Sequence, residues 1–419
     1  MNLRKVGSLA VVSFSNLGLS FVTQLYIITV LGTNRETDAL FAGMTLPQLL
    51  LSILSGSLIN VLVPLLVGTE KDRLKREIWG FVIFVTLIFG LITSILSLTA
   101  TIWGPLIFPG FAGYSKELLI QLTRIQLLGV IFTAVSGVFW AYYYSINKFI
   151  ITELTQLTAG ILSIIALYFL LPKYGVVAAA WVFTGKIFLQ VVFLIYFVGF
   201  KKPSLKSSIF KTTWLRMKPL LWGSVIYKTD PVIDRFLASM TPPGALSLLF
   251  LSQQIFSAGN QIISKTLVIP TLPILTKFIK ENQWKSYKST FWKKFYTLII
   301  VNTILLTIGL VFFKLITPLF SILDYRYNYN LFFKILLLSS FSFIIPSIGQ
   351  LMANSFYAMG ETKKITKLGM VAFLLGIPIK FTLYYYFDIE GLASAISIYY
   401  LISFLIIVTE INKRFKLHV

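Results

Sequence analysis

The stretch FAGMTLPQLLLSILSGSLINVLVPLL (residues 41–66) has a counterpart in the second half of the chain, FLSQQIFSAGNQIISKTLVIPTLPIL (residues 250–275). The two stretches align without a gap at an offset of 209 residues, which brings Pro64 over Pro273. Each stretch is an apolar run long enough to cross a membrane. An apolar segment that occurs twice in the same register predicts a fold built from two related halves.

A second pair of segments supports this repeat. Tyr144 and the later segment LLPKYGVVAAA (170–180) correspond to Tyr357 and the later segment YYYFDIEGLASAI (384–396). Both pairs occur in the same order and at nearly the same offset. A lysine-rich loop near the middle of the chain separates the halves. We therefore expect an amino-terminal lobe at 1–200, a basic cytoplasmic linker at 201–218 and a carboxy-terminal lobe at 219–419.

The composition is that of an integral membrane protein. Of 419 residues, 57% are hydrophobic and 12% are charged, and the mean hydropathy is +0.83, whereas soluble domains carry about a quarter charged residues. The first apolar run contains polar residues and leads into a second span, so we expect a retained helix and no cleaved signal peptide. The predicted fold is all-α, with twelve spanning helices at 8–31, 39–67, 78–104, 118–144, 150–171, 175–200, 217–240, 245–276, 293–318, 330–358, 365–387 and 389–411.

Lysine and arginine alternate between dense and sparse loops along this arrangement. With the amino terminus inside, the inner segments hold 25 of these residues and the outer segments hold five. This asymmetry predicts that both termini are cytoplasmic. The net charge of +22 is then explained by the orientation of the chain in the membrane, together with attraction to anionic membrane lipids. Nucleic-acid binding is not needed to explain it. We expect a multi-pass protein of the bacterial inner membrane that works as a monomer.

Two halves of six helices each begin and end on the same side, so the predicted repeat is parallel. This symmetry is typical of transporters that bind a substrate between two lobes and expose it alternately to each side. We do not expect an enzyme, because no catalytic constellation or Gly-rich phosphate loop is found in the sequence. Cysteine is absent, which excludes disulfides, thiol catalysis and Cys-ligated metals. No cofactor is expected apart from a Na⁺ or H⁺ ion that would couple transport.

Charged residues inside the predicted helices are the candidate site residues, because each costs about 2.5–3.5 kcal/mol at the centre of a membrane helix. Seven basic and three acidic residues lie within or at the edge of spans: Arg124, Lys186, Lys228, Arg235, Lys265, Lys314 and Lys380, against Glu153, Asp230 and Asp234. This excess of cations favours an anionic substrate. In a lipid-linked substrate the natural anion is the phosphate or diphosphate that joins lipid to head group.

The segment YKTDPVIDRFLAS (227–239) holds four of these charges. At about 100° per residue, Lys228 and Arg235 share one helix face, and Asp230 and Asp234 lie on the opposite face. Pro231 predicts a bend. We expect Lys186, Lys228, Arg235 and Lys265 to bind the substrate in the cavity, and the two aspartates to couple an ion. The alternative is that the aspartates pair with Lys186 or Lys265 on neighbouring helices.

TNRETDALFAGMTLPQLLLSILSGSLINVLVPLL (33–66) and DRFLASMTPPGALSLLFLSQQI (234–255) resemble the MviN/MurJ lipid II flippases. They also resemble the wider multidrug/oligosaccharidyl-lipid/polysaccharide (MOP) superfamily, which includes the Wzx-type flippases. The resemblance implies a V-shaped pair of six-helix lobes and a cationic cavity that flips undecaprenyl-diphosphate-linked sugars. It also places Asp38 and Asp234 at positions that match the family, as candidates for ion coupling or pairing.

The chain departs from the MurJ pattern at the cavity arginines of helices one, two and eight, where Thr23, Ser52 and Gln254 stand. MurJ proteins also carry two further carboxy-terminal helices. These departures favour a flippase for another polyprenyl-diphosphate-linked oligosaccharide, such as an O-antigen, capsule or exopolysaccharide repeat unit. The alternatives are a lipid II flippase, a cation-coupled drug antiporter of the same superfamily, and a non-transporting scaffold.

Overall fold

The computed structural model describes residues 3–66, 70–204, 212, 213, 215, 217, 228–323 and 328–417, and every regular element in them is a helix. The chain divides into two compact units, Met1–Gly244 and Ala245–Val419. This division follows the helix at 230–239, which the sequence assigns to the second lobe. Most of the 201–218 linker lies outside the described residues, so the predicted lobe boundary stays a prediction.

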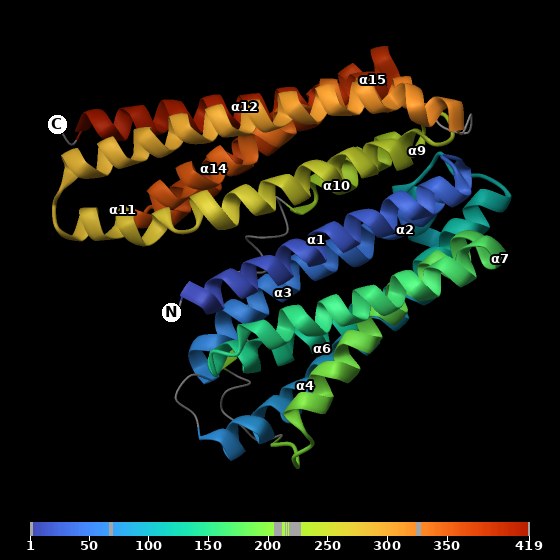
Figure 1. Ribbon diagram of the computed structural model, residues 1–419, viewed down its shortest axis with the longest axis horizontal. Coiled ribbons are helices and arrows are strands. Elements are labelled where there is room, and N and C mark those ends of the chain that lie inside the picture. The colour runs from blue at the N-terminus through green and yellow to red at the C-terminus, as the bar shows by residue number, and fades with distance from the viewer. Residues whose placement is uncertain are drawn as a thin grey trace. The chain divides into compact units, whose positions relative to one another are not determined.

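The first unit is built around one central helix, α6, against which α2, α3, α4 and α7 pack, while α1 packs on α7 (Figure 1). Gln126 of α6 donates a hydrogen bond to the carbonyl of Leu40 at 3.1 Å, and Tyr143 donates one to Leu194 at 3.0 Å. These side chains tie α6 to its neighbours. The helices of this unit are α1 (Leu3–Leu31), α2 (Arg35–Gly43), α3 (Thr45–Leu66), α4 (Lys71–Leu98), α5 (Ala100–Ile107), α6 (Tyr114–Ser145), α7 (Phe149–Val198) and α9 (Asp230–Ser239).

The second unit is arranged around α14, which packs against α10, α11, α12 and α15 (Figure 1). The buried Asn302 of α12 donates hydrogen bonds to the Ile344 carbonyl at 2.9 Å and to the Ser347 hydroxyl at 2.7 Å, both on α14. Its elements are α10 (Ala245–Ile263), the π-helical turn η1 (Ser264–Val268), α11 (Thr271–Lys280), α12 (Trp284–Leu323), α13 (Tyr329–Leu338), α14 (Phe341–Ala358) and α15 (Thr362–Leu417).

Eight helices in the described part of the chain are long and apolar enough to cross a membrane. Their outward faces are apolar: on α4, Leu87, Leu91 and Leu98 are 68%, 64% and 77% exposed, as expected for side chains that meet lipid and not water. Two of the eight, α7 and α15, are 50 and 56 residues long, and each contains one residue with non-helical backbone angles.

Both long helices are hairpins with the break at an equivalent residue. Gly175 of α7 has φ 57° and ψ −143°, and Asp388 of α15 has φ 53° and ψ −135°. The same 213-residue separation relates Asn147, with φ 56°, to Gly360, with φ 77°, at the carboxyl ends of α6 and α14. The backbone therefore repeats its special conformations at matched positions. This agrees with the repeat predicted from Tyr144 and Tyr357.

Several predicted spans are interrupted. The expected helix at 39–67 is divided into α2 and α3 at Met44, because Pro47 has no amide hydrogen to donate to the carbonyl of Gly43. The expected helix at 245–276 contains the π-helical turn, and the one at 330–358 is divided between Leu338 and Phe341. The break within 362–417 falls at Asp388, between the predicted helices 365–387 and 389–411.

Candidate functional site

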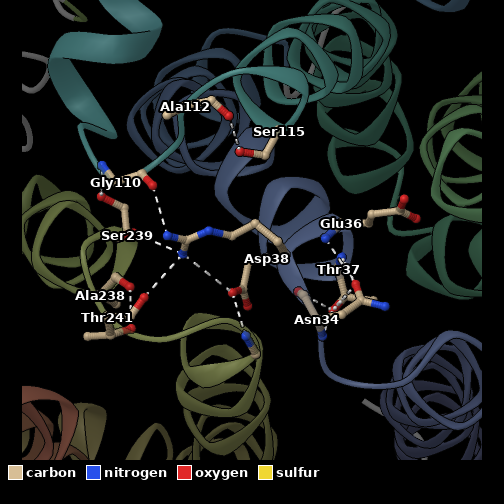
Figure 2. A network of polar contacts seen from close by, with 12 residues as sticks. Asn34, Glu36, Thr37, Asp38, Gly110, Ala112, Ser115, Ala238, Ser239 and Thr241 are labelled. Carbon is tan, nitrogen blue, oxygen red and sulfur yellow. Dashed lines mark hydrogen bonds and ion pairs between the residues drawn. The ribbon is translucent and has the colours of Figure 1, made fainter.

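The entry into α2 is fixed by a capping box. The Asn34 side chain accepts hydrogen bonds from the amides of Glu36 at 2.9 Å and Thr37 at 3.0 Å, and the Asn34 amide donates to Thr37 Oγ1 at 2.9 Å (Figure 2). Capping of this kind satisfies amides that the first helical turn leaves free. The cap holds the first turn of α2, and with it the side chains of Arg35 and Asp38, in a fixed direction.

Arg35 connects α2 to two segments that are distant in the sequence. Its Nη2 donates to the carbonyl of Gly110 at 2.8 Å, and its Nη1 donates to the carbonyls of Ser239 and Thr241, each at 3.2 Å (Figure 2). The guanidinium also lies 5.0 Å from the ring centroid of Phe111. One side chain thus holds together the start of α2, the loop before α6 and the carboxyl end of α9.

Asp38 completes this arrangement. Its carboxylate is fully buried, accepts a hydrogen bond from the Gly244 amide at 2.7 Å, and lies 3.9 Å from Arg35 Nη1. Gly244 has φ +89°, and a Cβ atom there would lie 2.7 Å from the Thr33 carbonyl oxygen. A Cβ on Gly110 would overlap the Ser239 carbonyl. We call this set the polar junction: Arg35, Asp38, Gly110, Ser239, Thr241 and Gly244.

A second set of polar contacts joins α3 to α9. Arg235 is 6% exposed, and its guanidinium donates to Thr45 Oγ1 at 2.9 Å and to Gln48 Oε1 at 3.0 Å. Lys228, two residues before the start of α9, donates through Nζ to the carbonyl of Ser52. Thr45, Gln48 and Ser52 are spaced i, i+3, i+7 and so share one face of α3. We call these five residues the α3–α9 seam. The two cations predicted to share a face of the 227–239 segment both contact α3.

The other predicted site residues occupy separate places. Lys186, on the second arm of α7, is half-buried, and its Cε lies 3.6 Å from where a Cβ on Gly160 would be. Leu19 of α1 lies against the same point. Lys186 makes no hydrogen bond or ion pair with any residue that the structure describes. Lys265 is exposed on the π-helical turn.

The acidic candidates lie at or near the start of α9. Asp230 begins this helix, and Asp234 is buried one turn later. Pro231 occupies the first turn of α9, directly after a turn at Thr229. Residues 218–227 lie outside the described part of the chain, so the predicted bend at Pro231 stays a prediction. Among the described residues no cluster of histidine, aspartate and glutamate could hold a metal ion.

Arg35 was not among the predicted site residues, because its position made it one of the few cations of the outer loops. The sequence around Arg35 nonetheless indicated the start of a helix. Asn34 precedes an apolar helix, with an acid at position 38 in its first turn, which is typical of a capped helix start. Thr45, Gln48 and Ser52 were also missed, although their spacing marks a polar stripe on an apolar helix.

The fold is similar to those of solved transporters of the MOP superfamily. A solved structure described as the inward-facing conformation of a multidrug resistance MATE family transporter of this superfamily aligns with a TM-score of 0.72 at 14% identity, covering 100% of this chain and 96% of that one. A structure described as lipid II flippase MurJ in an inward closed conformation aligns with a TM-score of 0.78 at 17% identity, covering 96% of this chain and 87% of that one.

The sequence assigns the chain within that class. The family model described as "Lipid II flippase MurJ" matches residues 27–419, and the chain belongs to this family. The "Probable lipid II flippase MurJ" of Buchnera aphidicola subsp. Schizaphis graminum (strain Sg) is 23% identical over 98% of this chain and 84% of its own length. Its counterpart from subsp. Acyrthosiphon pisum (strain APS) is 22% identical over 94% and 81%. The resemblance to MurJ is confirmed, and the chain is a multi-pass protein of the bacterial inner membrane.

The predicted cargo was wrong. The departures at Thr23, Ser52 and Gln254 led us to expect an O-antigen, capsule or exopolysaccharide repeat unit, but the family matched over 27–419 is the lipid II flippase family. A comparison of sequence positions cannot detect a cation that reaches the same place from another helix. Lys228, two residues before the start of α9, donates to the Ser52 carbonyl. Lys186 of α7 and Leu19 of α1, which is one helical turn from Thr23, both lie near the point where a Cβ on Gly160 would be.

Proposed function

We propose that this chain translocates lipid II, the lipid-linked peptidoglycan precursor, from the inner to the outer leaflet of the bacterial inner membrane. The observation that carries this proposal is the match of the lipid II flippase family model to residues 27–419. The excess of basic residues within the apolar helices supports it, because the diphosphate of such a substrate is an anion. The chain would act as a transporter without a metal or organic cofactor.

The finer architecture in this proposal is twelve spanning helices in two six-helix lobes, with both termini in the cytoplasm. Two observations support it. The hairpins α7 and α15 each contribute two helices, on either side of Gly175 and Asp388. The lysine and arginine residues are concentrated in alternate loops. In this arrangement the polar junction, at the start of α2, belongs to the outer side of the membrane.

We propose that the diphosphate binds to cations supplied by helices other than those that carry arginine in related flippases. Lys228 donates to the Ser52 carbonyl, and Lys186 lies near Gly160, as does Leu19, which is one helical turn from Thr23. Lys186 has no partner among the described residues and is therefore available to a phosphate. Arg235 and Lys228 are engaged by α3 in this conformation, so substrate binding would exchange these protein contacts for phosphate oxygens. Lys265, exposed on the π-helical turn of the second unit, stays a candidate from the sequence.

The polar junction and the α3–α9 seam would together keep α9 against α2 and α3 on the outer side. Release of the substrate outward requires these contacts to open. Asp38 in this proposal pairs with Arg35 and the Gly244 amide. Coupling of transport to Na⁺ or H⁺ through Asp230 or Asp234 stays a hypothesis. Collapsing each gradient separately in proteoliposomes would distinguish the two ions.

The decisive experiment measures lipid II translocation in proteoliposomes with Lys228→Gln, Lys228→Arg and the double variant Ser52→Arg/Lys228→Gln. A hydrogen bond between charged groups is worth roughly 1.5–3 kcal/mol, so Lys228→Gln should slow translocation by about 10- to 100-fold. Lys228→Arg keeps the charge and should remain active. The double variant should recover most of the rate, because the cation returns to the same place from α3.

Two different failures are distinguishable in this assay. A Lys228→Gln protein that moves lipid II at the wild-type rate would contradict the role of Lys228 and leave the cargo unaffected. A wild-type protein that moves another diphosphate-linked lipid but not lipid II would contradict the proposed function itself. Equal amounts of folded protein in each preparation are the control.

A further inference from the structure

One end of the second unit carries a concentration of lysine residues. The first turns of α12 and α15 and the last turns of α15 meet there. Lys288 of α12 donates to the carbonyl of Phe415, and Arg414 Nη2 lies 3.1 Å from Glu361 Oε2. The Phe415 ring centroid lies 5.2 Å from that of Phe291. These contacts fix the helix ends next to one another.

The carboxylates described at this end are all engaged in ion pairs. Glu281 lies 3.8 Å from Lys277, Glu410 pairs with Lys364, and Glu361 pairs with Arg414. Lys285 and Lys293 of α12 and Lys413 and Lys416 of α15 are exposed, and none of these four forms an ion pair or hydrogen bond with a described residue. Their ammonium groups are therefore available to an anionic ligand.

The exposed stripe of α12 changes in character along the helix. It begins with Lys285 and Lys293, continues with Tyr296, which is 58% exposed, and goes on with Ile300, 57% exposed, and Ile308, 59% exposed. Trp292 stacks on Tyr296 at a centroid distance of 5.9 Å. Lysine, then aromatic, then aliphatic side chains on one face are typical of a helix that passes from the head-group layer into the hydrocarbon.

Both arms of α15 show the same change. On the first arm, the exposed side chains pass from Lys363 and Lys367 to Leu374, which is 59% exposed. On the second arm, Leu405, 53% exposed, leads to Lys413. The faces of α12 and of both arms of α15 therefore place the boundary between head groups and hydrocarbon near this end of the unit. The unpaired lysines lie on the head-group side of that boundary.

We infer that this end of the second unit is a binding site for an anionic glycerophospholipid. Lys285, Lys293, Lys413 and Lys416 contact the phosphate and head group, and the acyl chains lie along Tyr296 and Ile300. A lysine ammonium binds phosphate oxygens strongly, and basic side chains at the membrane surface attract anionic lipids. A zwitterionic lipid offers no net charge to this surface and is bound more weakly. This site lies on lipid-facing surfaces and does not depend on the proposed cargo.

The test uses the full chain purified in detergent and measures binding of phosphatidylglycerol, with phosphatidylcholine of the same acyl chains as the comparison, by native mass spectrometry. The variant Lys285→Gln/Lys293→Gln/Lys413→Gln/Lys416→Gln should lose roughly tenfold or more of its phosphatidylglycerol affinity. The matched variant with arginine at the same four positions should bind like the wild type. The phosphatidylcholine signal should be the same in all three proteins.

Three results would overturn the inference. They are unchanged phosphatidylglycerol binding in the glutamine variant, equal binding of both lipids by the wild type, and displacement of the lipid by millimolar inorganic diphosphate, which would indicate a site for the free anion. The single variant Lys293→Gln, whose side chain is exposed and whose folding is not at risk, should bind about two- to fivefold more weakly. Normal affinity in this variant would also contradict the site.

Discussion

At the residue scale, the polar junction is defined by the hydrogen bonds of Arg35 and by the close approach of the Gly110 backbone to Ser239. Arg35 distributes its donors among three carbonyls at 2.8 to 3.2 Å, which replaces the water that a guanidinium would otherwise bind. The approach of the Gly110 backbone to Ser239 is possible only because residue 110 has no side chain. The loop before α6 and the end of α9 are therefore held together by the hydrogen bonds of Arg35 and by the close fit of the Gly110 backbone against Ser239.

Gly110→Ala should separate these two segments. The added methyl group overlaps the Ser239 carbonyl, and overpacking of this kind costs about 1–3 kcal/mol. The sequence has no cysteine, so a single Ser239→Cys substitution reports on the site without background. In the otherwise wild-type protein this buried thiol should react slowly with maleimide. With Gly110→Ala it should react at least several-fold faster.

Gly90→Ala is the matched control, because a Cβ atom at Gly90 of α4 meets nothing within 4 Å. It should leave the reactivity of the thiol introduced by Ser239→Cys unchanged and should not lower the unfolding temperature, because alanine is favoured over glycine within a helix. Equal reactivity in the Gly110 and Gly90 variants would contradict the role assigned to the close approach.

The α3–α9 seam could be predicted only in part from the sequence. The common face of Lys228 and Arg235 follows from helical periodicity and could be predicted. Their partners on α3, Ser52 for Lys228 and Thr45 and Gln48 for Arg235, lie between 176 and 190 residues away in the chain. A single sequence does not indicate which polar stripe meets which basic face. The pairing had to come from the three-dimensional structure.

At the element scale, the two hairpins form the same turn with different residues. Gly175 and Asp388 have nearly the same φ and ψ, in a region that glycine adopts readily and other residues adopt at a cost. The amino-terminal half therefore carries the favourable residue, and the carboxy-terminal half carries a strained one.

Asp388→Gly should stabilise the protein. Relief of the backbone strain is worth about 1–2 kcal/mol, which should appear as a higher midpoint of thermal unfolding in detergent. Gly175→Ala should lower the same midpoint by a similar amount, since it introduces the strain that Asp388 already has. If Asp388→Gly unfolded at a lower temperature, contacts of the carboxylate would outweigh the strain.

The sequence predicted the location of these turns better than the internal breaks of the helices. The predicted boundary between 387 and 389 coincides with Asp388, because a hairpin must return across the membrane and the two apolar runs have fixed lengths. The π-helical turn at Ser264–Val268 was not predicted. Hydropathy measures how apolar a segment is, and a π turn has the same composition as an α turn.

At the scale of the whole molecule, the repeat was predictable because it recurs in both sequence and backbone. The cargo was not, because the substitutions at Thr23 and Ser52 were judged by their sequence positions alone. Lys228, just before α9, contacts Ser52, and the sequence alone does not show this contact. Family membership depends on similarity along residues 27–419, and it corrected what a few positions had suggested.

The proposed orientation can be tested with two single cysteines. Lys173, next to the Gly175 turn, and Lys285, at the start of α12, are both exposed. With both termini in the cytoplasm, Lys173→Cys should react with a membrane-impermeant maleimide in intact spheroplasts. Lys285→Cys should react only after the membrane is permeabilised. The reverse pattern would invert the topology, and labelling of both residues from one side would contradict the proposed arrangement of spans between them.

The contacts of Arg35 also bear on how this transporter can diverge during evolution. Its hydrogen-bond acceptors are main-chain oxygens of Gly110, Ser239 and Thr241, and every amino acid offers such an oxygen. Selection therefore acts unequally on the two sides of the junction. The arginine and Gly110 must persist, whereas the buried residues 239 and 241 can change to other small side chains as long as the backbone keeps its path. Lineages that share this junction should retain it while the α9 side of the contact loses recognisable sequence similarity.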